Sequence, residues 1–273
     1  MASRKRAQTS DSPKSTHICI VGGGSSGWMM AAYLSRHFNV DGKKVKLTLV
    51  ESAEVPKTGV GEATIHTMRG YLEEAGISEQ KFIDACQGTF KHGIEFVGWT
   101  ASGKPFFHPF EVPPQVFQDP MALFFLSAGR NEGAVSRYDN WAGIQSRLAR
   151  RGVAPRRVED REYTGVVPYG YHLDANAFAH FLKGISIKRG VQHVVSHVDD
   201  VEVSDGKITQ LHMKDGKKIK ADLWVDCTGF AARLISALGA EFQSSSARLL
   251  VDSAVTCQVH GEEIKTRPFT TAT

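Results

Sequence analysis

The sequence predicts an α/β protein built around a parallel sheet, and three observations point to this fold class. Between residues 17 and 51, a buried strand, a glycine-rich turn, a helix and a second strand follow one another. Between residues 190 and 221, short strands alternate with Asp-Gly hairpin turns and predict a β-meander. An apolar strand over residues 221–227 then returns to the sheet.

The first turn has the G-x-G-x-x-G spacing of a dinucleotide-binding site, formed by Gly22, Gly24 and Gly27. The first glycine makes the tight turn, the second lets backbone approach a pyrophosphate, and the third lets the helix pack on the strand. The helix N-terminus then faces the phosphates with unpaired N–H groups. The second strand ends at Glu51, near the position expected for a carboxylate that accepts a hydrogen bond from a ribose hydroxyl.

The rest of the chain indicates which dinucleotide is bound. Enzymes that bind both FAD and NADPH on separate Rossmann units carry two fingerprints, and this sequence has one. A simple nicotinamide dehydrogenase does not need the long insert, about residues 100–170, or the meander. We therefore expect a Rossmann-like FAD-binding domain over residues 17–273, with an inserted helical region and a β-meander, as in flavin monooxygenases. Residues 1–16 are expected to form a disordered basic tail.

The remaining elements follow from periodicity and capping signals. Ser78 is predicted to cap a helix that runs to residue 87, and Asp174 to cap a helix that ends at Gly190. Further expected elements are helices over residues 64–75 and 137–150, a strand over residues 89–99, and hairpin turns at residues 205–206 and 215–216.

Composition excludes several classes of protein. The formal net charge of +4 comes mostly from the N-terminal tail, so a nucleic-acid partner is not indicated. No apolar run approaches the ~20 residues that span a bilayer, and the N-terminus lacks a secretory core. The four cysteines form no C-x-x-C, and the scattered histidines, His172, His180, His193 and His197, lack ligand spacing. We expect a reduced, cytoplasmic protein without a structural metal.

Five segments resemble the flavin-dependent tryptophan halogenase family. Residues 22–29 resemble its G-G-G-x-x-G-W-x opening, and residues 59–64 its G-V-G-E-A-T loop. Residues 90–99 resemble its F-K-x-G-x-x-F-x-x-W segment. Two shorter blocks, at residues 171–175 and 226–229, match as well. The sequence is therefore identified as similar to the N-terminal portion of this family.

This resemblance implies a chemistry. In the family, reduced FAD from a separate flavin reductase, O2 and chloride or bromide give hypohalous acid. A lysine, here Lys91, then holds the acid or is itself chlorinated. It passes the halogen to an electron-rich aromatic molecule such as tryptophan or an indole. The residues expected at the cofactor are Gly22, Gly24, Ser25, Ser26, Gly27, Trp28, Glu51, Gly59, Gly61, Glu62, Ala63, Thr228 and Gly229. A homodimer is left open.

The sequence departs from the family in two ways. His66 stands where the family has a proline after the G-V-G-E-A-T loop, and the family's W-x-W-x-I-P block does not occur. Family members run further than Thr273, so we expect residues 1–273 alone to lack turnover. A flavin-binding remnant or split-gene half, and an aromatic hydroxylase, stay open as alternatives. Four aromatic residues could be either core or substrate wall: Trp99, Phe106, Phe107 and Phe110.

Overall fold

The structure of the chain is a computed structural model that describes residues 15–38, 44–55, 61–112, 119–121, 139, 143–249, 251–257 and 266–273. The chain divides into two compact units. Unit 1 comprises Met1–Thr58 and Ala179–Asp252, and unit 2 comprises Gly59–Phe178 and Ser253–Thr273. Each unit is described by itself.

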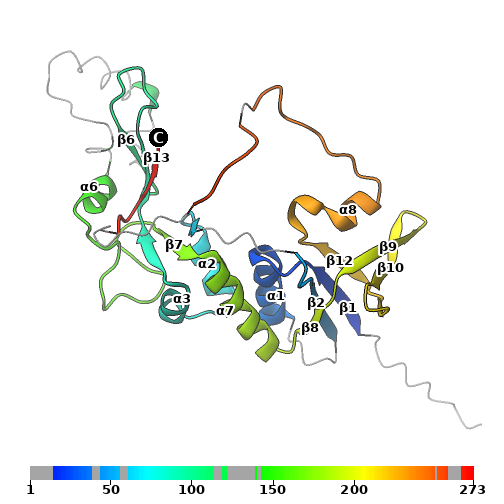
Figure 1. Cartoon of the computed structure of the whole chain (residues 1–273). Helices are drawn as coiled ribbons and strands as arrows, with labels where there is room; N and C mark the ends of the chain where they lie inside the picture. Colours follow the sequence, from blue (N-terminus) through cyan, green and yellow to red (C-terminus); the bar gives the residue numbers. More distant parts are fainter. Residues whose placement is uncertain are drawn as a thin grey trace, which may run out of the picture. The chain divides into compact units, whose positions relative to one another are not determined.

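Unit 1 is built on a four-stranded parallel sheet (Figure 1). The strand order is β12 (Leu223–Asp226), β1 (Thr16–Val21), β2 (Val45–Glu51) and β8 (Gln192–Val195). The helix α1 (Ser25–His37) connects β1 to β2 and packs against both strands. Because β1 pairs Val21 with Asp226 on one side and with Val50 on the other, the carboxyl ends of all three strands meet at one edge. Ligands of open α/β sheets collect at this edge.

A meander covers one face of this sheet. It consists of β9 (Val198–Ser204), β10 (Lys207–Met213) and β11 (Lys218–Ile219), with residues 205–206 and 215–216 in turns as predicted. Cys19 and Val21 of β1 pack in one buried cluster with Leu211 and Met213 of β10. The cluster also includes Leu234 of α8 (Arg233–Ala237), which follows the 3-10 turn η3 (Gly229–Ala231). The predicted α/β class with its meander is confirmed.

Unit 2 holds two small three-stranded sheets. The first has the order β3 (Gly61–Ala63), β7 (Gly170–Asp174) and β4 (Thr89–Lys91) and is antiparallel. The second has the order β13 (Thr270–Ala272), β5 (Gly93–Phe96) and β6 (Phe106–Pro109). The helices of this unit are α2 (Met68–Glu74), α3 (Glu79–Cys86), α6 (Gln145–Arg150) and the first turn of α7 (Ala175–Lys188).

The two predicted helix caps are confirmed. The Ser78 hydroxyl accepts a hydrogen bond from the N–H of Lys81 at the start of α3. The Asp174 carboxylate accepts one from the N–H of Ala177 at the start of α7.

Three predicted boundaries are wrong. The strand expected over residues 89–99 is two strands, β4 and β5, in different sheets, because His92 turns between them and donates its N–H to the carbonyl of Pro268 at 2.7 Å. The helix expected from residue 64 begins at Met68, since Thr64 donates both its N–H and its hydroxyl to the carbonyl of Tyr171. The strand expected over residues 221–227 is confined to β12.

The helix expected over residues 137–150 lies partly outside the described residues, and the described part is helical over α6 and at Asp139. Among the residues that the structure describes, no helix is both long and apolar enough to cross a membrane.

Candidate functional site

The glycine-rich turn of unit 1 lies between the ends of β1 and β12. Gly22 has a φ of +119°, and a Cβ atom on it would lie 2.1 Å from the carbonyl oxygen of Cys227. A Cβ atom on Gly27 would lie 1.9 Å from the carbonyl oxygen of Gly22. Gly22 and Gly27 are therefore needed for the fold of the turn itself.

Gly24 differs from these two glycines, because a Cβ atom on it would meet no atom of the described residues within 4 Å. Gly24 caps the N-terminus of α1 and supplies no side-chain hydrogen bond to it. Ser25 and Ser26 follow in the first turn, and the Ser26 hydroxyl lies 3.6 Å from the Cys227 thiol. The space at Gly24 and the helix N-terminus behind it fit a pyrophosphate.

Glu51 ends β2 at the same edge and is buried. Its Oε2 atom lies 2.9 Å from Nε2 of His193 and 3.4 Å from Nζ of Lys183. A Cβ atom on Gly23 would lie 2.3 Å from Cγ of Glu51, so the glutamate side chain passes directly over Gly23. The predicted ribose carboxylate is thus fixed beside the glycine-rich turn.

Trp28 is fully buried in unit 1, and its ring contacts the edge of the His193 ring at a centroid distance of 5.3 Å. Its Nε1 atom has no hydrogen-bond partner among the residues that the structure describes. The Trp28 side chain is therefore part of the interior of unit 1.

The Asp226 carboxylate organises the segment after β12. Its Oδ1 atom accepts hydrogen bonds from the N–H and the hydroxyl of Thr228, and Oδ2 accepts from the N–H groups of Leu234 and Ile235. Burial works to raise the pKa of Asp226, but these hydrogen bonds outweigh it and hold the pKa below its usual value. Thr228 and Gly229 are thereby held at the same sheet edge.

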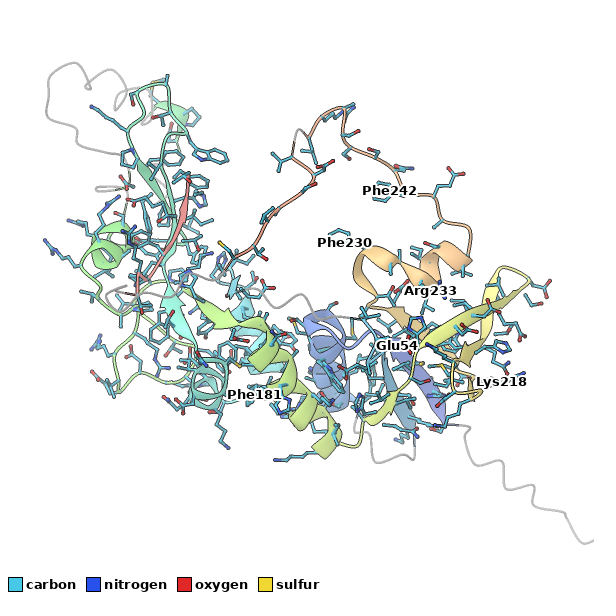
Figure 2. All side chains as sticks on the ribbon, viewed as in Figure 1. Glu54, Phe181, Lys218, Phe230, Arg233 and Phe242 are labelled. Atoms are coloured by element: carbon cyan, nitrogen blue, oxygen red, sulfur yellow. The ribbon has the colours of Figure 1, made fainter. Side chains whose placement is uncertain are left out.

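Arg233, the first residue of α8, connects this helix to β9 by hydrogen bonds. Its guanidinium donates to the carbonyl oxygens of Val198 and Asp199 in β9, and Figure 2 labels this side chain beside β9.

Lys91 lies in unit 2 at the end of β4 and is 2% exposed. Its Nζ atom is 3.5 Å from the carbonyl oxygen of Ala63 in β3 and 5.5 Å from the centre of the Phe110 ring. Burial lowers the pKa of Lys91, because the charged ammonium loses solvation. The structure thus brings the predicted lysine next to the segment predicted to lie beside the flavin.

His172 lies between the two outer strands of this sheet, opposite Ala63 on one side and Thr89 on the other. Its Nε2 atom is 3.1 Å from the hydroxyl of Thr270. Burial, followed by the charge of Lys91, lowers the pKa of His172 to about 4. The imidazole is therefore neutral at neutral pH.

A buried carboxylate supports β7 beneath this site. Oε1 of Glu79 accepts hydrogen bonds from the hydroxyls of Tyr169 and Tyr171 at 2.7 and 2.6 Å, and Oε2 pairs with Arg156. Burial, followed by the hydrogen bond to Glu79, raises the pKa of Tyr171 far above its usual value. The Tyr171 backbone pairs with Phe90, the residue before Lys91, so this network fixes the strand that faces the lysine.

The other predicted site residues have different settings. Gly61, Glu62 and Ala63 form β3 and are exposed within unit 2, and Gly59 lies outside the described residues. Of the four aromatic residues left open, Phe107 and Phe110 are buried. Trp99 and Phe106 are exposed.

Sequence reasoning missed the residues that support the site: Gly23, Lys183, His193, Asp226 and Glu79. The middle position of the unbroken run Gly22-Gly23-Gly24 was the available signal for Gly23. No local pattern marks His193 or Glu79, whose partners lie far away in the sequence.

Comparison with known proteins gives consistent matches. The sequence profile of the tryptophan halogenase family matches residues 17–273. SttH of Streptomyces toxytricini, a tryptophan 6-halogenase, is 37% identical over 261 residues, which are 89% of this chain and 49% of that protein. RebH of Lentzea aerocolonigenes, a tryptophan 7-halogenase, is 31% identical over 280 residues, which are 96% of this chain and 52% of that protein.

Solved structures match as well. The crystal structure of the tryptophan 6-halogenase from Streptomyces toxytricini has a TM-score of 0.75 at 35% identity, over 85% of this chain and 48% of that one. BrvH, a flavin-dependent halogenase from Brevundimonas sp. BAL3, has a TM-score of 0.69 at 32% identity, over 85% of this chain and 46% of that one. The chain spans about half the length of the curated relatives it matches.

Proposed function

Because the chain belongs to the tryptophan halogenase family, we propose that it provides the FAD-binding site and the lysine of a flavin-dependent halogenase acting on an electron-rich, indole-like aromatic molecule. The observation that carries this proposal is the burial of Lys91 against the carbonyl of Ala63. Burial of an ammonium is costly, so a buried lysine is a candidate for function, and the setting of Lys91 in two segments that resemble the family supports this assignment.

Several residues of unit 1 would hold the FAD. The N-terminus of α1, with Gly22, Gly24, Ser25, Ser26 and Gly27, would bind the pyrophosphate. Glu51 would accept a hydrogen bond from the ribose, with Thr228 and Gly229 beside it at the sheet edge. Trp28, which is buried, would support the turn from below.

The resemblance assigns Gly59, Gly61, Glu62 and Ala63 to the cofactor as well, and glycines in such a segment allow backbone to approach a ligand closely. Reduced FAD bound at this site would supply the reaction with O2 that oxidises chloride or bromide to hypohalous acid. A separate flavin reductase would deliver the reduced FAD.

Lys91 would present the halogen to the arene in one of two ways. As an ammonium it would donate hydrogen bonds to the oxidised halogen species and polarise it towards an electrophile. As a neutral amine, favoured by its lowered pKa, it would instead exchange one N–H proton for the halogen of hypohalous acid, with release of water. The arene would then take the halogen from Nζ and lose a proton, which restores the amine. In the first form the halogen would lie beside Nζ, and in the second it would be bonded to Nζ.

A second candidate is a flavin-binding half without turnover. It is favoured by the length of the match, since the chain spans about half of its relatives. Holding an arene at the lysine contributes much of the rate of such a reaction, and that positioning would then come from elsewhere.

The test supplies the chain with FAD, NADH, a flavin reductase, O2 and bromide or chloride, and detects halogenated indoles and phenols by mass spectrometry. In a full-length version of the protein, the Lys91→Ala variant should lose arene halogenation and keep flavin oxidation, whereas Lys81→Ala, on the exposed side of α3, should change neither. Undiminished product from Lys91→Ala would contradict the assignment of the lysine. FAD binding without any product would favour the second candidate, and hydroxylated arene would indicate a hydroxylase.

A further inference from the structure

We propose that His193 and Lys183 are positioning residues that hold the Glu51 carboxylate for the ribose of the adenine half of FAD. This inference rests on the proposed function, because it concerns how the nucleotide is held. It assigns a role to two side chains outside the glycine-rich turn.

The geometry of the carboxylate carries the inference. His193 of β8 and Lys183 of α7 both approach the same oxygen of Glu51, Oε2, at 2.9 and 3.4 Å. The register of the sheet pairs His193 with Leu49, two residues before Glu51, so the imidazole and the carboxylate are diagonal neighbours on one face. Strand pairing thus fixes the distance between them.

Two further groups restrict this cluster. The Trp28 ring stands against the His193 ring at an interplanar angle of 61°, and Nζ of Lys183 lies 5.8 Å from the centre of the Trp28 ring. Gly23 forms the opposite wall, since even a methyl group there would overlap the Glu51 side chain. Glu51 is therefore confined by a strand, a helix and the glycine-rich turn.

Confinement of this kind has a consequence for binding. A glutamate side chain that is already ordered loses less rotamer entropy when a ligand arrives. An ionised carboxylate, with the Lys183 ammonium beside it, accepts hydrogen bonds and cannot donate them. A ribose hydroxyl is the donor that such a group recognises.

The experiment measures recognition of the ribose hydroxyls directly. Calorimetry would give the affinities of the whole chain for ADP, 2′-deoxy-ADP and 3′-deoxy-ADP, because ADP is the half of FAD that Glu51 would contact. In the wild type, removal of the recognised hydroxyl should weaken binding by about tenfold or more, the value of a hydrogen bond to a charged group. Glu51→Gln should reduce the ratio between the affinity for ADP and the affinity for the deoxy analogue.

The variants His193→Gln and Lys183→Met should weaken the binding of ADP more than the binding of the deoxy analogue. The ratio of the two affinities should therefore fall towards one. Lys183→Arg should restore it, because it keeps the charge. His180→Gln and Lys188→Met, at exposed positions of α7, are matched controls and should keep the wild-type ratio.

Three results would overturn the inference. One is an unchanged affinity ratio in His193→Gln and Lys183→Met, although Glu51→Gln loses the preference for ADP over its deoxy analogue. Another is an equal loss of affinity for ADP and its deoxy analogues together with a lower Tm, which is the mark of a structural role. The third is a wild-type ratio of one. If the wild-type chain binds neither ADP nor FAD, the proposed function fails and the inference fails with it.

Discussion

The Nζ atom of Lys91 lies 3.5 Å from the carbonyl oxygen of Ala63, two strands away in a three-stranded sheet whose middle strand is β7. The lysine side chain therefore reaches across β7 towards the segment that contains Gly61, Glu62 and Ala63. A long amine held in this way is close to one backbone acceptor and one aromatic ring, Phe110, and has little contact with water.

The two glycines Gly22 and Gly24 should respond differently to substitution. Gly22→Ala places a methyl group onto the Cys227 carbonyl at a positive φ, so we expect the free energy of unfolding to fall by about 3 kcal/mol or more. Gly24→Ala enters open space at an ordinary φ and should leave stability within about 0.5 kcal/mol of the wild type. Urea denaturation of both variants checks this, and equal destabilisation would contradict it.

Removal of the buried amine should stabilise the chain at neutral pH. The pKa of Lys91 is lowered from 10.5 in the folded protein, so the unfolded chain binds more protons between the two values, and wild-type stability rises with pH across that window. Lys91→Met should therefore be more stable than the wild type by about 1 kcal/mol or more at pH 7.

This advantage of Lys91→Met should shrink as the pH approaches 10.5, the unfolded pKa. Thermal unfolding of wild type and variant at pH 7 and at pH 10.5 measures the difference. A constant advantage at both pH values would show that desolvation of the ammonium is not its cause. Lys81→Met is the exposed control.

His172 should make the chain sensitive to acid. Its pKa is about 4 in the folded protein against 6.5 unfolded, so its contribution is present above pH 6.5 and is lost as the pH falls through 4. The loss amounts to about 3 kcal/mol, at 1.36 kcal/mol for each unit of pKa. His172→Gln should be less sensitive across this range, as measured by urea denaturation at pH 7, 5.5 and 4, whereas His180→Gln should behave as the wild type. Parallel curves for His172→Gln and wild type would refute the assignment.

The carboxylate of Glu79 should be essential for the fold of unit 2. Glu79→Gln leaves the partly buried Arg156 without its ion pair, and breaking a buried pair in this way costs about 3–5 kcal/mol. Glu74→Gln, on the exposed surface of α2, is the matched control. Chemical denaturation provides the comparison, and a Glu79→Gln variant as stable as the control would show that the network is dispensable.

The elements that local sequence determines were predictable. The βαβ unit is a continuous run of residues, and its turn needs Gly22 and Gly27 because a side chain there would overlap the neighbouring backbone. Ser78 and Asp174 each cap a helix that begins at the next residue. The hairpin turns of the meander are local as well. In these segments the chain's own periodicity and turn chemistry decide the structure.

Features decided by distant partners were not predictable in this way. The apolar pattern of residues 89–99 reads as one strand, but His92 binds the backbone of Pro268 and divides it. The role proposed for Lys91 came from the resemblance, since a lysine on a short strand carries no signal of burial. The partners of Glu51 reach it through the pairing of β2 with β8, which a single sequence does not reveal.

The most direct test of FAD binding at the glycine-rich turn is a titration of the wild-type chain and its Gly24→Val variant with FAD and, separately, with NADPH, followed by flavin fluorescence and calorimetry. We expect the wild type to bind FAD and not NADPH. We expect Gly24→Val to keep its Tm and lose FAD, because the new side chain occupies the open space at the N-terminus of α1. Tight binding of NADPH without any affinity for FAD, or unchanged FAD affinity in Gly24→Val, would contradict the central claim.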